Sequence, residues 1–138
     1  MIYFGINTMR RTNIDYEIGK GKVADYVAMM DRIYKNRLEE LKLYENSLWD
    51  YVPELGENFD YYNTLRFVRT WNIVKNELNV SDRNLIFCFL ACDSNYDECL
   101  SWFNGNGRDL KNVASLRVLI CNVRKKVRTI YAEKYGNE

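Results

Sequence analysis

The sequence contains no histidine, and its four cysteines do not form a Cys-x-x-Cys pair. Zinc sites and most acid–base or nucleophilic active sites depend on one or the other of these features. A carboxylate-only reaction is left as an alternative, such as a metal-dependent nuclease that uses Asp93, Asp97 and Glu98. A capped helix start with acids in its first turn explains these three residues more simply. We therefore expect no enzyme activity, no metal and no cofactor.

The chain also has little that breaks a helix, with one proline and seven glycines in 138 residues. Long stretches without a breaker favour helices joined by short loops over a many-stranded sheet. Hydrophobic residues make up 47% of the chain and aromatic residues 14%, which is ample for a packed interior. The sequence therefore predicts an all-α fold of about five helices.

Long hydrophobic runs are absent as well. The longest apolar run, residues 85–92, has eight residues and is too short to cross a bilayer. The first residues, MIYFGINTMRR, lack the continuous apolar region of a secretory signal. Cys88 and Cys92 fall in the apolar run, four apart on one helical face, where reduced cysteines act as small buried hydrophobes. We expect a cytoplasmic protein with no membrane partner.

Apolar residues spaced three and four apart divide the chain into an N-terminal arm with a helical hairpin (residues 1–78) and a C-terminal unit (residues 79–138). Ser81 is a suitable N-cap for the third helix, which is nearly all apolar and should be the most buried element. Asn104 to Gly107 is a strong turn signal. The predicted helices cover residues 22–48, 59–78, 82–92, about 95–103 and 112–131.

The first predicted helix, residues 22–48, offers a second reading of the chain. Its apolar residues recur over several turns, as in a helix that pairs with a second copy or with another protein. Asp31 and Lys35 form a charge pair four residues apart on its outer face. Five acidic residues and no basic one follow between Glu45 and Asp60. This helix and the acidic loop would be the working surfaces of a helical assembly protein.

Positive charge gathers near the other end. Seven basic residues and one acidic residue lie between Arg108 and Arg128, although the net charge of the whole chain is only +1. Such a local excess points to an anionic partner. Two short helices, a glycine-bearing turn and a longer basic helix follow the order of a helix-turn-helix.

Three segments of this region resemble region 4 of the sigma-70 family of RNA polymerase sigma factors. They are residues 80–86 (VSDRNLI), residues 95–100 (NYDECL) and residues 114–127 (ASLRVLICNVRKKV). The resemblance covers about fifty residues. It implies a C-terminal helix-turn-helix that binds promoter DNA, with the RNA polymerase core as a further partner. Residues 1–80 show no convincing region 2, so we expect a compact sigma-like DNA-binding protein instead of a complete initiation factor.

The expected contacts with double-stranded DNA follow from residue chemistry on the helix near residues 112–131. A hydroxyl and a guanidinium near its start, from Ser115 and Arg117, can meet base edges. The remaining cations are placed to neutralise phosphates: Arg108, Lys111, Arg124, Lys125, Lys126 and Arg128. The alternative is a non-catalytic interaction or assembly component of a phage or mobile element, which forms homo- or hetero-oligomers through residues 22–48.

Overall fold

The computed structural model describes residues 21–47, 55–56, 58–105 and 112–136. Within these residues the chain forms helices and no strands, which confirms the all-α prediction. None of the described helices combines the length and the hydrophobicity that crossing a bilayer requires. The expected arm at residues 1–20 lies outside the described part of the chain. The helices are α2 (Gly21–Glu45), α3 (Tyr61–Asn76), α4 (Val80–Ala91), α5 (Tyr96–Gly105) and α6 (Val113–Tyr135).

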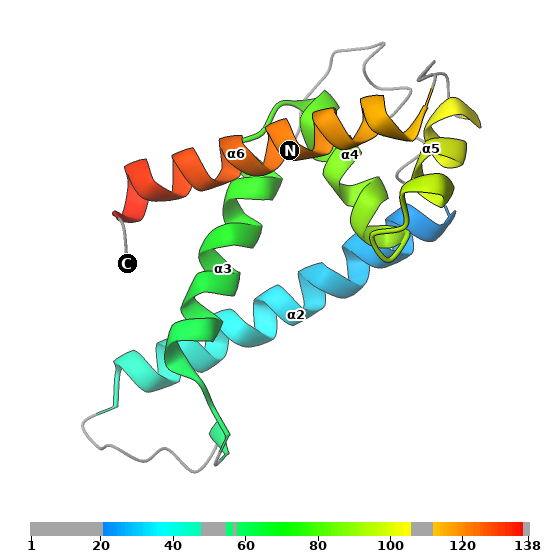
Figure 1. The fold of residues 1–138 in the computed structure, drawn as a ribbon. Coiled ribbons are helices and arrows are strands. Elements are labelled where there is room, and N and C mark those ends of the chain that lie inside the picture. The colour runs from blue at the N-terminus through cyan, green and yellow to red at the C-terminus, as the bar shows by residue number, and fades with distance from the viewer. Residues whose placement is uncertain (1–20, 48–54, 57, 106–111, 137–138) are drawn as a thin grey trace.

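The two longest helices, α2 and α6, lie on opposite sides of the molecule, and α3 and α4 cross between them (Figure 1). α2 packs against α3 and α4, while α6 packs against α3, α4 and α5. α5 lies beside the first half of α6, at the end away from the chain's C-terminus (Figure 1). One long face of α6 therefore rests on the rest of the molecule and the other faces outward.

Four helices begin at a side-chain cap. Asp60, Asn79, Asn95 and Asn112 each accept a hydrogen bond from the backbone amide three residues later, at 3.1, 2.8, 3.0 and 2.9 Å respectively. Each bond satisfies one of the amides that a helix start leaves without an intrahelical partner. The prediction of Ser81 as the cap of α4 is wrong. Asn79 takes that place, so α4 begins earlier and Ser81 lies in its first turn.

The hydrophobic core draws side chains from all five helices, including Val23 of α2, Trp71 of α3, Cys99 of α5 and Leu116 of α6. α4 contributes the most, because every residue from Asn84 to Phe89 is buried. This confirms the expectation that the apolar third helix is the most buried element. The core also fixes the orientation of α6, because the buried side chains of α6 pack against those of α4.

The carboxylate of Asp31 joins α2 to α3, although the sequence predicts that it pairs with Lys35 on its own helix. Asp31 accepts a hydrogen bond from Trp71 Nε1 at 2.9 Å and from Lys75 Nζ at 3.0 Å. The predicted pairing of Asp31 with Lys35 is therefore wrong. Trp71 is buried, and the indole N–H of a buried tryptophan usually finds an acceptor, so the carboxylate turns toward α3.

Candidate nucleic-acid interface

The turn between α4 and α5 brings two aromatic rings beside α6. Asp93 and Ser94 adopt left-handed backbone angles, with φ of 55° and 61°, which reverse the chain within four residues. The Ser94 amide donates to the carbonyl of Phe89 at 3.0 Å and closes the end of α4. As a result Phe89, near the end of α4, and Tyr96, at the start of α5, lie with ring centroids 4.8 Å apart.

Two predicted DNA contacts rest on these rings. The Arg117 guanidinium lies 4.7 Å from the centre of the Tyr96 ring, and that of Arg124 lies 5.4 Å from the Phe89 ring. Both arginines are exposed. A guanidinium held over a ring face keeps its charge and its N–H donors while its position becomes restricted. The two guanidiniums are therefore pre-positioned without being neutralised.

The opposite flank of α6 is neutralised by acids. Lys126 Nζ is 2.5 Å from Asp82 Oδ2 of α4, and Lys134 Nζ is 2.8 Å from Glu77 Oε2 at the end of α3. The expectation that Lys126 contacts phosphate is not supported, because Asp82 already engages it. Among the described residues, no ion pair involves Arg117, Arg124, Lys125 or Arg128. The uncompensated charge of α6 is thus confined to one flank and its outer face.

Ser115 and Arg117, both predicted to meet base edges, lie on different faces of α6. Residues two apart on an α-helix point about 160° away from each other, so these two side chains leave opposite sides of α6. Both are exposed, and α2 packs against α3 and α4 instead of covering them. Ser115 shares its face with Val118 and Asn122, which are also exposed and which sequence reasoning missed.

Val118 is 59% exposed on an otherwise polar helix face. The helical repeat, counted from the apolar stripe of Leu116, Ile120 and Val123, is the signal that could have identified this face. Serine, asparagine and a methyl-bearing side chain are residue types that read base edges in a DNA groove. Lys125 lies next to them on the outer face, while Arg108 and Lys111 lie outside the described residues.

The acids of the alternative nuclease reading do not form a metal site. Asp93 occupies the turn, whereas Asp97 and Glu98 lie in the first turn of α5, and Glu98 forms an ion pair with Lys22 of α2. In the described ranges, no group of three histidine, cysteine or acidic side chains is arranged to hold a metal ion. In this part of the chain the acids start a helix and join α5 to α2.

The cysteines are free thiols, and three of them lie in the core. The Sγ atoms of Cys88 and Cys99 are 3.5 Å apart across the contact between α4 and α5. The hydrogen bond to Cys99, together with burial, holds the pKa of the Cys88 thiol well above its usual range. A protonated, buried thiol is a poor nucleophile. Cys121 alone is exposed, on the outer face of α6.

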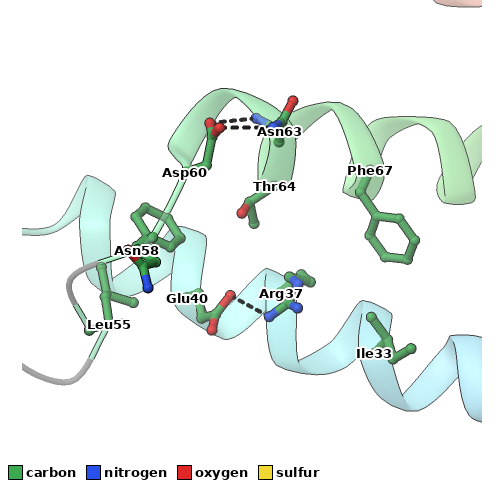
Figure 2. A pocket seen from close by; sticks show the side chains of 11 residues that line it. Ile33, Arg37, Glu40, Leu55, Asn58, Asp60, Asn63, Thr64 and Phe67 are labelled. Atoms are coloured by element: carbon green, nitrogen blue, oxygen red, sulfur yellow. Dashed lines mark hydrogen bonds and ion pairs between the residues drawn. The ribbon is translucent and has the colours of Figure 1, made fainter.

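A separate opening of about 590 Å³ lies between the far end of α2 and the start of α3. Figure 2 shows Thr64 and Phe67 pointing from α3 toward Ile33 and Arg37 of α2. Its charged groups already have partners: Arg37 Nη1 donates to Glu40 at 3.0 Å, and Asp60 caps α3. The lining of the opening is about equally polar and apolar, and the charged side chains named above are already engaged.

Exposed aromatic and aliphatic side chains surround this end of the molecule. Tyr44 stacks on Tyr61 with ring centroids 4.7 Å apart, and Tyr62 is 71% exposed. Leu43 is also exposed on the same turn of α2. Apolar surface of this kind is a common feature of protein contacts, and it lies where the alternative reading expected an interaction surface.

No protein-family model, no curated protein and no solved structure matches the chain. The geometry of α4, α5 and α6 therefore carries the functional argument.

Proposed function

We propose that the protein binds double-stranded DNA as a sigma-like transcription protein in the cytoplasm, with α4, α5 and α6 forming a helix-turn-helix. α6 is the recognition helix and α5 the support helix. The observation that carries the proposal is the asymmetry of charge on α6. Acids of α3 and α4 neutralise one flank, whereas Arg117 and Arg124 on the other are stacked on aromatic rings and keep their charge.

The exposed side chains of α6 divide into two roles. Arg124, Lys125 and Arg128 contact phosphates, and so supply affinity that depends on salt. Ser115, Val118 and Asn122 contact base edges in the major groove, and so supply sequence preference. Arg117 lies on the same side of α6 as Arg124 and Arg128, and its guanidinium is held beside the first turn of α5.

The test is binding of a random-sequence duplex pool to the wild type at several salt concentrations, followed by selection of preferred sequences. Lys125→Ala should weaken binding to all sequences equally. Asn122→Ala should relax the preference at one position, by about 1–3 kcal/mol if it makes a bidentate base contact. Arg32→Ala on the outer face of α2 removes an equal charge and serves as the control.

Absence of duplex binding at low salt would refute the proposal. The alternative, a non-catalytic assembly or adaptor protein, would then stand, and the exposed Leu43, Tyr44 and Tyr62 would be its first surface to test. If promoter-like sequences are selected, co-purification with core RNA polymerase is the next measurement, because the sigma-like arrangement implies that partner.

A further inference from the structure

The second half of α6 forms a groove with α3 that has no place in the recognition-helix scheme. The groove encloses about 380 Å³. Arg66 of α3 and Arg128 of α6 lie on it, together with the hydroxyl-bearing residues Thr70 and Tyr131. Val127 adds an apolar surface between them. The groove thus combines two cations and two hydroxyl groups with a lining that is mostly apolar.

Its positive charge is uncompensated. No carboxylate lines the groove among the described residues. Arg66 is exposed and makes one neutral contact, since its Nη1 donates to Asn63 Oδ1 at 3.3 Å. Arg128 is exposed, and no ion pair involves it in the described ranges. Two exposed arginines that line one groove match the oxygens of a phosphate group.

One wall of the groove is held in place by aromatic contacts. The Arg69 guanidinium lies 4.4 Å from the centre of the Tyr135 ring, and its Nη1 is 3.5 Å from the Tyr131 hydroxyl. Tyr131 and Tyr135 also pack edge to face, with centroids 5.1 Å apart. These contacts join α3 to the last turns of α6, so the groove is part of the folded domain and its shape does not depend on a ligand.

The groove continues the arginine flank described above. Arg117, Arg124 and Arg128 are seven and four residues apart, which places them on the same side of α6. From Arg117 to Arg128 the helix rises about 16 Å at 1.5 Å per residue. Arg66 then extends the row from α6 onto α3.

The end of α6 does not cancel this attraction. Carbonyl groups at a helix C-terminus carry partial negative charge, but their effect is limited to the last turn. Arg128 precedes Tyr135, the last residue of α6, by about two turns. Ala132 and Gly136 also line the groove, so the partial negative charge of the helix end lies beside the two full positive charges of Arg66 and Arg128, and a net positive charge remains.

We infer that the α3–α6 groove binds the sugar-phosphate backbone of the duplex whose bases meet the first half of α6. This inference rests on the proposed function and assigns it a second contact. Phosphate oxygens accept hydrogen bonds from Arg66 and Arg128, and the deoxyribose rests on Val127 and Tyr131. The groove contributes affinity and fixes the angle at which α6 crosses the duplex, and it reads no bases.

The test measures how the binding constant for a fluorescent duplex depends on salt, by anisotropy, for the wild type and the double variant Arg66→Ala/Arg128→Ala. The plot of log K against log salt has a negative slope. Loss of two phosphate contacts should make this slope shallower by about 1.8, at roughly 0.9 per contact. The order of preference among duplex sequences should not change. Arg66→Lys/Arg128→Lys should restore most of the slope.

The double variant Arg32→Ala/Lys35→Ala on the outer face of α2 is the control, because it removes the same charge from exposed positions away from the groove. If the alanine variant of the groove does not fold, as judged by circular dichroism, Arg66→Gln/Arg128→Gln keeps the length of both side chains and takes its place.

Equal slopes for the groove variant and the α2 control would overturn the inference while leaving the recognition helix intact, provided that Lys125→Ala still weakens binding. Failure of the wild type to bind any duplex would overturn both the recognition helix and the groove. The two failures are therefore distinguishable in one set of titrations.

Discussion

Replacing Asp31 by alanine should destabilise the protein by about 2–3 kcal/mol, because this carboxylate joins α2 to α3. It accepts from Trp71 Nε1 at 2.9 Å, and Trp71 is only 4% exposed. A hydrogen bond to a charged group contributes roughly 1.5–3 kcal/mol, much of it through the penalty for leaving the indole N–H without an acceptor. The ion pair with Lys75 is partly exposed and adds roughly 0.2–1 kcal/mol.

The assay is thermal and urea unfolding, followed by circular dichroism. For a chain of this size, 2–3 kcal/mol corresponds to a fall in melting temperature of about 6–12 °C. Asp31→Asn keeps an oxygen acceptor for Trp71 and removes the charge, so it should cost roughly 1 kcal/mol. Asp25→Ala on the same helix removes an exposed carboxylate and should change stability by less than about 0.5 kcal/mol.

A double-mutant cycle separates the two contributions. In a Trp71→Phe background the indole donor is gone, so Asp31→Ala should cost only the ion pair with Lys75, roughly 0.2–1 kcal/mol. The reasoning is refuted if Asp31→Ala costs the same in both backgrounds, or if it costs no more than Asp31→Asn. Either result would mean that water replaces the carboxylate at the indole.

Two further predictions concern titratable groups. The hydrogen bond to Glu77 raises the pKa of Lys134 above its ordinary value of 10.5. From neutral pH up to 10.5 this pair stabilises the fold fully, and its effect is lost as pH rises through the folded-state pKa of the lysine. The difference in urea midpoint between wild type and Glu77→Gln should therefore be constant from neutral pH up to 10.5 and shrink above it, and a difference that grows there would contradict the pairing. In the folded protein a thiol reagent should modify Cys121 rapidly and the three buried cysteines only after unfolding. The variant Cys121→Ser should lack the rapid phase. Rapid modification of two or more thiols would contradict this prediction and show that the contact between α4 and α5 opens readily.

Local signals allowed much of the fold to be predicted. The stripe of Leu116, Ile120 and Val123, spaced four and three apart, places the buried face of α6 correctly, and all three are buried. The helices predicted at about 95–103 and 112–131 begin within one residue of the observed starts of α5 and α6. These features depend only on neighbours within one helical turn, which the sequence lists directly.

Contacts between distant residues could not be predicted in this way. Lys126 follows Asp82 by 44 residues, and Trp71 follows Asp31 by 40, so nothing in the spacing indicates that they meet. For the same reason the rings beneath Arg117 and Arg124 could not be found from the sequence. Only the packing of α4 and α5 against α6 shows which cations of the basic segment have no acidic partner among the described residues.

The faces of α6 show a different limit. Ser115 and Arg117 were grouped because both are polar and near the start of the helix, although the helical repeat places them on opposite sides. The stripe of Leu116, Ile120 and Val123 gives the direction of the core, so the same repeat could also have placed Val118 and Asn122 on the outer face.

The length of α6 has a consequence for how its direction is set. α6 has 23 residues, so it extends about 34 Å. Its first half packs beside α4 and α5, and its second half is joined to α3 through Arg69 and Tyr131. Because both halves are anchored, α6 cannot rotate about its own axis at one end without rotating at the other. The direction in which Arg117 points is therefore set partly by the contacts between α3 and the last turns of α6, which restrict rotation of the helix about its axis.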